Sequence, residues 1–235
     1  MSIPFFYIET FEAATKTIVL DENNSRHAVQ VLRMKEGEKI NLTDGQGNLI
    51  TAEITDAHKK HCSVKIQAVS NKPRASRQIT IAISLLKNTN RFEWFLEKAT
   101  EIGVSEIIPL ICERTEKQKF RFDRMKGICI SAMLQSQQCW LPVLQEPIRF
   151  ADLVIWKLDN YQKLIAHCVE SQKQMLDHQI ISKSSNQLIL IGPEGDFTKT
   201  EIDLVLKNDF IPVSLGETRL RTETAGVVAA TLLSI

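Results

Sequence analysis

Two glycine-containing loops lie where an α/β protein would bind its ligand. Gly192-Pro193-Glu194-Gly195 follows the apolar stretch 188–191, and the loop 216–222 follows the stretch 213–215. Ligands of open α/β sheets bind beyond the carboxyl ends of the strands. Glycine lets the backbone approach a ligand closely, and proline stiffens a turn. Alone, the first loop is more typical of a plain strand-to-helix turn, so its interpretation depends on the second.

The second loop leads into an apolar helix that carries charges at its start. The stretch 223–233 is small and apolar on most faces, which predicts burial against the sheet or against a partner subunit. Arg221 and Glu223 bring charge to the edge of a core, which is costly unless the charges are paired or used. They are therefore the candidate chemical residues. The chain has no GxGxxG, P-loop or GxSxG pattern to support another nucleotide or esterase site.

A local basic stretch between residues 117 and 126 is a candidate surface for nucleic acid. It carries five basic residues and one acidic residue, with Phe120 and Phe122 interleaved. Basic residues that neutralise phosphates and phenylalanines that stack on bases would explain this composition. A solvent-exposed segment that leads into a helix, with its phenylalanines packed inward, would explain it equally well. A smaller basic group precedes residue 36, where ordinary exposure also explains each member. The candidate RNA contacts are Arg26, His27, Arg33, Lys117, Lys119, Arg121 and Arg124.

The two loops need a sheet to position them, and the chain after residue 77 has the pattern of an α/β domain. Apolar runs of strand length alternate there with helical periodicity, which predicts a mostly parallel sheet. The expected strands are 79–86, 106–112, 163–168, 187–191 and 211–215. The expected helices are 92–102, ending at Gly103, then 123–137, and one that begins at the capping box Thr198–Glu201.

The chain before residue 70 follows a different pattern. Short alternating runs between residues 40 and 69, with a turn at 44–47, predict the hairpins of a small antiparallel barrel. One or two helical turns are expected at 27–33. The polar segment 70–77 contains Pro73 and has no apolar periodicity, so it is the best linker candidate. We expect two domains, residues 1–72 and 73–235.

Composition narrows the class of protein further. The 235 residues are 43% hydrophobic and 24% charged, which is typical of a folded protein. A net charge of +1 gives no global attraction to nucleic acid or to an anionic membrane, so any basic surface is local. The chain has no basic N-terminal region before an apolar run. It also has no apolar stretch of roughly 18 residues, the length that a membrane span needs. We expect a protein that is neither exported nor inserted.

The cysteines and histidines indicate a reducing compartment and no metal. Five cysteines are scattered without a CxxC pair, which argues against a disulfide framework and a structural zinc site. The segment His58–Cys62 is the nearest approach to a metal cluster, but it contains two lysines and is typical of a charged hairpin tip. These observations predict a cytoplasmic protein without a metal.

Five motifs in order resemble those of a known family, the bacterial 16S ribosomal RNA (uracil-N3)-methyltransferases of the SPOUT class. The resemblance covers the whole chain. The motifs are Arg26–Met34 with Gly37, Lys98–Val104 leading to Ile108-Pro109, Gln135-Ser136 ahead of Leu141-Pro142, Ile191–Gly195, and Leu215-Gly216 followed by Leu220–Ala225.

The resemblance implies an N-terminal PUA-like β-barrel that helps hold RNA, and a C-terminal α/β domain with a deep trefoil knot. It implies a homodimer that uses S-adenosyl-L-methionine (SAM) to methylate a uridine at N3 in 16S rRNA of the small ribosomal subunit. Arg221 would stabilise negative charge on the uracil, and Glu223 would orient that arginine or act in proton removal. The implied cofactor contacts are Leu190, Gly192, Pro193, Glu194, Gly195, Leu215, Gly216, Leu220 and Thr222.

The chain also departs from the family pattern. Asp196 stands where many family members have a glycine after Gly-Pro-Glu-Gly. Where they read Leu-Gly-x-Arg-Ile-Leu-Arg, this chain has Thr218 and Arg219 before Leu220-Arg221, so that one arginine is displaced by one position. Many family members also have Glu-Gln ahead of a serine or cysteine and an arginine two positions further on, whereas here Leu134 stands in place of the glutamate and Gln138 in place of the arginine. Two alternatives remain open: a SPOUT methyltransferase with another target, such as a ribose 2′-hydroxyl of transfer RNA, and a non-catalytic RNA-binding or ribosome-assembly protein.

Overall fold

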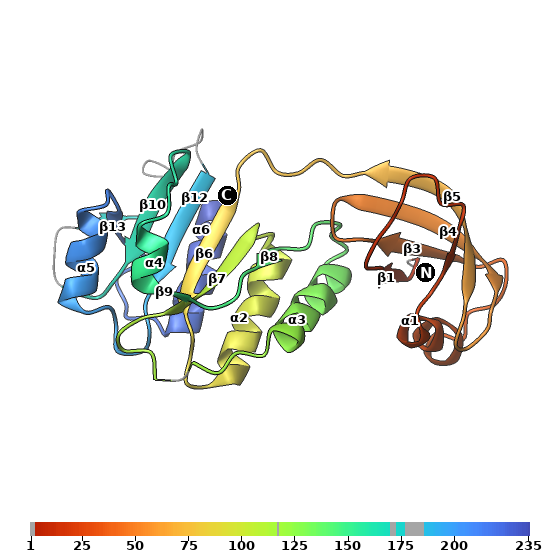
Figure 1. The fold of residues 1–235 in the computed structure, drawn as a ribbon, viewed down its shortest axis with the longest axis horizontal. Coiled ribbons are helices and arrows are strands. Elements are labelled where there is room, and N and C mark those ends of the chain that lie inside the picture. The colour runs from red at the N-terminus through yellow and green to blue at the C-terminus, as the bar shows by residue number, and fades with distance from the viewer. Residues whose placement is uncertain (1–2, 117, 170–172, 177–185) are drawn as a thin grey trace. The chain divides into compact units, whose positions relative to one another are not determined.

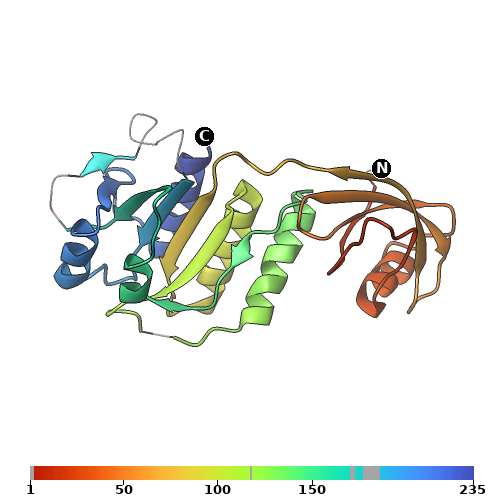
Figure 2. The same ribbon diagram turned by 45° about the horizontal axis from the view of Figure 1, so that its top comes forward.

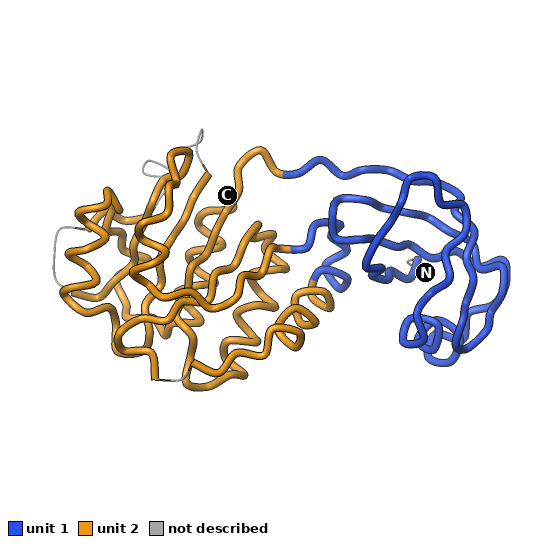
Figure 3. The backbone as a smooth tube through the Cα atoms, viewed as in Figure 1, with its two compact units in different colours: residues 1–74, 133–141 blue, residues 75–132, 142–235 orange. Residues whose placement is uncertain are grey.

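The chain forms two compact units in a computed structural model, which describes residues 3–116, 118–169, 173–176 and 186–235. One unit comprises residues 1–74 and 133–141, and the other comprises 75–132 and 142–235 (Figure 3). Sequence analysis gave no sign that the segment 133–141 belongs with the first unit. No helix among the described residues is long and apolar enough to cross a membrane.

Unit 1 is built on a five-stranded sheet with the order β1-β3-β4-β5-β2. The expected hairpins are present, whereas β1 pairs with β3 in parallel, so the sheet is mixed. A parallel pair needs a long connection, and here it contains a short helical stretch. The elements are β1 (Phe5–Tyr7), β2 (Thr17–Val19), α1 (Glu22–Arg26), η1 (His27–Val31), β3 (Lys39–Thr43), β4 (Asn48–Asp56) and β5 (Ser63–Asn71).

Trp140 lies in the segment 133–141, which belongs to unit 1, and it covers the turn between β3 and β4. Its indole Nε1 donates a hydrogen bond to the Lys72 carbonyl oxygen at 3.0 Å. Gly47 has a φ of +91°, and a Cβ there would lie 2.5 Å from the Trp140 ring. Glycine is therefore required for both the backbone conformation and the packing.

Unit 2 is an α/β domain with an eight-stranded sheet in which every strand pair is parallel (Figures 1 and 2). The strand order is β11-β13-β10-β12-β6-β7-β8, and β9 also pairs with β7. The strands are β6 (Ile79–Ser84), β7 (Glu106–Ile111), β8 (Val143–Leu144), β9 (Ile148–Arg149), β10 (Tyr161–Ala166), β11 (Gln174–Met175), β12 (Asn186–Ile191) and β13 (Ile211–Ser214). The helices are α2 (Thr89–Ile102), α3 (Phe122–Gln135), α4 (Phe150–Val154), α5 (Lys199–Leu206) and α6 (Thr222–Ser234).

Helices cover both faces of this sheet, which explains its apolar strands. All six residues of β6 are buried, as expected for a parallel strand with layers on both sides. Phe197, Ile202 and Phe210 pack with residues of α4 in a core on one side. On the other side α6 packs against α2, β6 and β12. This packing is close, because a Cβ on Gly226 would lie 2.6 Å from the Phe95 ring.

The strand order brings three loops together at one edge of the sheet. The strands β10, β12 and β13 are neighbours and parallel, so their carboxyl ends lie at the same edge. The chain order reverses between β6 and β12, which is the position where open α/β sheets bind ligands. The loops that follow these strands begin at His167, Gly192 and Leu215. The trefoil knot implied by the resemblance stays a prediction.

Candidate active site

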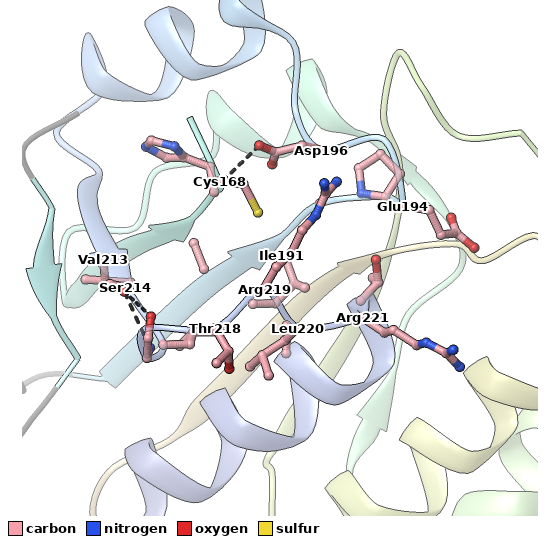
Figure 4. A pocket seen from close by; sticks show the side chains of 18 of the residues that line it. Cys168, Ile191, Glu194, Asp196, Val213, Ser214, Thr218, Arg219, Leu220 and Arg221 are labelled. Carbon is pink, nitrogen blue, oxygen red and sulfur yellow. Dashed lines mark hydrogen bonds between the residues drawn. The ribbon is translucent and has the colours of Figure 1, made fainter. Parts of the chain in front are cut away.

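The three loops and the starts of α2 and α6 enclose a cavity of about 690 Å³ (Figure 4). Its volume is within the usual range of small-molecule and cofactor pockets. The strand registers place Ala166 beside both Ile191 and Val213, so three apolar strand ends lie side by side at the cavity. Polar and charged groups surround them: Arg91, His167, Lys173, Glu194, Asp196, Glu217, Arg219 and Arg221.

The loop after β12 is fixed by contacts on both sides. Gly192 lies so close to Phe197 that an added Cβ would be 3.1 Å from the ring. The Gly195 carbonyl oxygen accepts a hydrogen bond from the Arg114 guanidinium at 2.6 Å. A Glu194 carboxylate oxygen accepts one from the Lys87 backbone amide at 3.3 Å. The loop therefore presents its backbone to the cavity in a defined conformation.

Asp196 shows why this position can differ from the frequent glycine of the family pattern. Its φ is +63°, in the left-handed region that glycine adopts freely and aspartate tolerates better than most residues. Its carboxylate accepts hydrogen bonds from the Cys168 amide at 2.8 Å and the Phe197 amide at 2.9 Å. The aspartate thus connects the loop after β12 to the loop after β10.

The loop after β13 carries two arginines that point in different directions. Gly216 has a φ of +143°, and its carbonyl oxygen accepts a hydrogen bond from the Ser214 hydroxyl at 2.9 Å. Figure 4 shows Arg219 directed toward the space between Cys168 and Glu194, whereas Arg221 points away from them. Arg221 is also the N-cap residue of α6. The positive end of this helix dipole therefore faces the cavity beside the Arg221 cation.

Glu223 pairs with a cavity residue but does not itself line the cavity. Its side chain is only 9% exposed, and its Oε1 lies 3.6 Å from Nε of Arg91. The other oxygen, Oε2, is buried without a hydrogen-bond partner among the described residues. Arg91, in the first turn of α2, lines the cavity. The buried carboxylate therefore places a cation at the site.

His167 is a buried polar side chain at the cavity. The residue is 7% exposed, and neither ring nitrogen has a hydrogen-bond partner within the described part of the chain. Burial lowers the pKa of His167, and nearby Lys173 lowers it further, while Asp196 acts in the opposite direction. Lys173 also donates a hydrogen bond to the His167 carbonyl oxygen at 2.8 Å. The ring is therefore neutral at pH 7, with one donor and one acceptor to offer.

Most of the predicted cofactor contacts come together here. The residues from that set that line the cavity are Gly192, Pro193, Glu194, Leu215, Gly216, Leu220 and Thr222. Leu190 lies instead in the apolar core with α4 and α5, and Gly195 also lies outside the lining. Arg221 lines the cavity and Glu223 does not. The roles assigned to these residues stay predictions.

Several cavity residues were not predicted from the sequence, among them Arg91, His167 and Lys173. Arg91 precedes the apolar pattern from which the helix 92–102 was predicted, and nothing local distinguishes it from a solvated charge. His167 and Lys173 follow β10, and no glycine-rich loop after this strand marks a ligand site in the sequence. Only the arrangement of β10 between β12 and β13 brings them to the site.

The basic stretch of unit 2 contains both exposed and paired cations. Lys119 and Arg121 are exposed, whereas Arg124 binds both carboxylate oxygens of Glu93, at 2.6 and 2.8 Å. Accordingly, hydrogen bonding to Arg124 lowers the pKa of Glu93. Lys117 is outside the described residues. The ring of Phe120 contacts those of Phe92 and Phe122, so the phenylalanines pack against protein.

The candidate RNA contacts of unit 1 lie at its short helical segment. Arg26 ends α1, and both it and His27 are exposed. The His27 ring packs edge-on against Phe6, with 5.7 Å between the ring centroids. Arg33 is exposed and has a φ of +57°. Their role in RNA binding stays a prediction.

The residues at the cavity fit SAM, a cofactor that combines a nucleoside with a cationic sulfonium. Glu194, Asp196 and Glu217 supply negative charge at the cavity. The apolar strand ends offer a surface for a ring, and His167 offers unused hydrogen-bonding nitrogens. The described residues contain no group of three or more His, Cys, Asp or Glu that could hold a metal ion.

Comparisons with known proteins agree with this geometry. Residues 73–234 match the RNA methyltransferase domain family, and residues 20–67 match the RNA methyltransferase PUA domain family. Ribosomal RNA small subunit methyltransferase E of Buchnera aphidicola (from Acyrthosiphon pisum) is 30% identical over 98% of this chain and 92% of its own. The protein of the same name from Rickettsia conorii is 29% identical over 95% of this chain and 91% of its own.

Solved structures share the fold over almost the whole chain. The crystal structure of a probable rRNA-methyltransferase from Porphyromonas gingivalis is 37% identical, with a TM-score of 0.90, and covers 97% of this chain and 95% of its own. Ribosomal RNA small subunit methyltransferase E from Neisseria gonorrhoeae, bound to S-adenosyl methionine, is 30% identical, with a TM-score of 0.87 and the same two coverages. The chain belongs to the RNA methyltransferase family that includes the ribosomal RNA small subunit methyltransferases E.

Proposed function

We propose that this protein transfers the methyl group of SAM to N3 of a uridine in 16S rRNA of the small ribosomal subunit. The observation that carries the proposal is that one cavity is lined by charged groups of both signs. Glu194 and Asp196 supply negative charge suited to a sulfonium, while Arg91 and Arg221 supply positive charge suited to an anionic nucleophile. The names of the relatives, and the SAM bound to the Neisseria gonorrhoeae protein, support the same activity.

The reaction requires a nucleophile that is weak in its resting form. Uridine N3 carries a proton, so the bond from N3 to the methyl carbon forms as the carbon–sulfur bond breaks and the N3 proton passes to solvent. When bound, SAM supplies an electrophilic methyl group. Arg221 and the N-terminus of α6 stabilise the negative charge that develops on the uracil. The rigid backbone of the loops holds the reacting groups in line.

Glu223 acts in this scheme by positioning a cation. It is buried, it lies outside the cavity lining, and its Oε1 faces Nε of Arg91. A general base must reach the proton that it removes. The contact therefore supports a positioning role for Glu223, with Arg91 as its partner in place of Arg221, the arginine expected from the sequence. In this proposal Arg91 contacts the nucleotide.

Unit 1 and the exposed cations of unit 2 hold the RNA in this proposal. The match of residues 20–67 to the PUA domain family supports a binding role for unit 1. Lys119 and Arg121 are exposed and can neutralise phosphates. The protein works as a cytoplasmic homodimer, which is in keeping with the apolar helix α6 and with five free cysteines.

The product of the reaction tests the proposal directly. Purified protein is incubated with SAM and small ribosomal subunits from cells that lack this activity, and the RNA is digested for nucleoside mass spectrometry. We expect 3-methyluridine with the wild-type protein and a strongly reduced yield with Arg221→Ala. A different methylated nucleoside would move the target, and SAM binding with no methylated product on either free RNA or subunits would contradict the proposal.

A further inference from the structure

The His167 imidazole is enclosed by the protein at the cavity with its hydrogen-bonding capacity unused. The residue is 7% exposed, and no other described residue bonds to Nδ1 or Nε2. Buried polar groups of folded proteins are almost always hydrogen-bonded, because burial without a partner costs free energy. The two ring nitrogens lie at a ligand cavity, so we expect a bound ligand to supply the hydrogen-bond partner of at least one of them.

The surroundings of His167 favour a flat, neutral ligand group. The residue directly follows Ala166, which lies beside Ile191 and Val213 in the strand registers. These apolar strand ends suit the face of a planar ring. The nearest charges, Lys173 and Asp196, have opposite signs, and the His167 ring is itself neutral. A neutral donor and acceptor pair is matched by the polar edge of a purine.

Two of the cavity cations, Arg91 and Arg221, come from elements other than β10. His167 follows β10, whereas α6 packs against β6, β12 and α2. Arg91 and Arg221 therefore gather at the side of the cavity formed by α2 and α6, where carboxylate and uracil oxygens find cations. This arrangement leaves the nucleoside half of the cofactor for the His167 side.

We propose that His167 is a specificity-determining residue for the cofactor, with one ring nitrogen hydrogen-bonded to the polar edge of the adenine. The proposal rests on the proposed use of SAM and extends it to a residue outside the glycine-containing loops. It also accounts for a buried imidazole to which none of the described residues hydrogen-bonds, because the bound adenine supplies a partner.

Binding measurements with matched ligands test the contact without any enzyme turnover. Isothermal titration calorimetry compares S-adenosylhomocysteine with S-inosylhomocysteine, whose purine carries a carbonyl in place of the amine. The full-length chain is used as wild type, His167→Phe, His167→Gln and the control His61→Phe, whose ring lies on the exposed hairpin of unit 1. Thermal unfolding without ligand reports whether each variant folds.

We expect His167→Phe to bind S-adenosylhomocysteine about tenfold more weakly, the effect of losing one good hydrogen bond. It should bind the inosyl ligand with little change, so that discrimination between the purines shrinks. Its unfolding temperature should equal or exceed that of wild type, because the substitution removes two buried nitrogens that have no partner among the described residues. His167→Gln, which keeps a donor and an acceptor, should recover part of the discrimination.

Three results would overturn the proposal. Unchanged affinity of both substituted proteins for S-adenosylhomocysteine would remove His167 from the cofactor contact. Equal losses for the two ligands, with a lower unfolding temperature, would make the residue structural. Failure of the wild-type protein to bind either SAM or S-adenosylhomocysteine would reject the proposed function itself, which the other two results leave intact.

Discussion

Arg91 and Glu223 connect the first turns of α2 and α6 through an ion pair with 3.6 Å between Nε and Oε1. The glutamate side chain is 9% exposed and the arginine side chain is 39% exposed, so the pair extends from the core to the cavity. A buried carboxylate is costly unless it is paired, and here its partner is a residue that lines the site. The pair therefore links packing of the two helices to the position of a cation at the cavity.

Replacing Glu223 by glutamine should reduce methyl transfer by about tenfold or more while SAM affinity changes less than about threefold. The amide keeps the size of the side chain but removes the charge that orients Arg91. Transfer rates and cofactor titrations measure the two effects. The control is Glu97→Gln, a partly exposed carboxylate on α2, the helix that carries Arg91. If Glu223 instead removes the proton, the rate of the variant will rise more steeply with pH than that of wild type.

Arg221→Ala should lower the rate of transfer by about 100-fold, the usual effect of removing one group that stabilises developing charge. The affinity for SAM should change only a few-fold, because the glycine-containing loops remain intact. Lys199→Ala is the control, because this exposed cation at the start of α5 lies outside the cavity lining. Equal losses of rate and of SAM affinity in Arg221→Ala would assign this arginine to cofactor binding or to folding.

Asp196 should be replaced less well by alanine than by glycine. Both substitutions remove the acceptor of the Cys168 and Phe197 amides, but alanine must also adopt a φ near the +63° of the aspartate. That conformation costs roughly 1–2 kcal/mol for a residue with a Cβ and little for glycine. Urea unfolding should therefore rank wild type above Asp196→Gly and Asp196→Ala last. The reverse order of the two variants would show that the backbone conformation is not the limiting factor.

Reversing Lys119 and Arg121 to glutamate should weaken RNA binding and reduce its dependence on salt. Each lost phosphate contact lowers the slope of log affinity against log salt by about 0.7–0.9. The double variant Lys199→Glu and Lys207→Glu changes the net charge equally on exposed residues of the α5 region and is the control. An RNA affinity that stays at the wild-type value over the whole salt range would remove the basic stretch from RNA binding.

Local signals predicted the elements that carry the cofactor loops. The capping box Thr198–Glu201 is present with both of its hydrogen bonds, and α5 begins directly after it. Gly103 ends α2 with a φ of +95°, as a glycine at that position does. The strands before the two glycine-containing loops end at Ile191 and Ser214, within one residue of their expected ends. Patterns of this kind depend on neighbours in sequence, so they can be identified without a structure.

The features that escaped prediction depend on contacts between distant parts of the chain. Trp140 packs on Gly47, more than ninety residues earlier, and neither residue has a local pattern that names the other. Arg91 becomes a site residue only because α2 packs beside α6. His167 does so only because β10 lies between β12 and β13. Strand order is set by the packing of the whole sheet. A sequence pattern describes one short stretch, so it cannot show which strands become neighbours.

Cys168 should be the one rapidly reacting thiol of the native protein, and S-adenosylhomocysteine should protect it. Cys168 is exposed and lines the cavity, whereas Cys62, Cys112, Cys129 and Cys139 are buried. Burial raises the pKa of Cys112 to about 12 and that of Cys129 to about 11, so at pH 8 only about 1 part in 10⁴ of the Cys112 thiol is ionised.

Titration of the native protein with a chromogenic disulfide reagent at pH 8 should therefore show one fast phase, which Cys168→Ser abolishes. Saturating S-adenosylhomocysteine should slow that phase several-fold, because the bound molecule covers the cavity wall that carries the thiol. A second fast thiol would mean that a buried cysteine is reached by opening of the fold. A fast phase unchanged by a ligand that calorimetry shows to be bound would place the ligand away from the loop after β10, and it would count against both this cavity and the His167 contact.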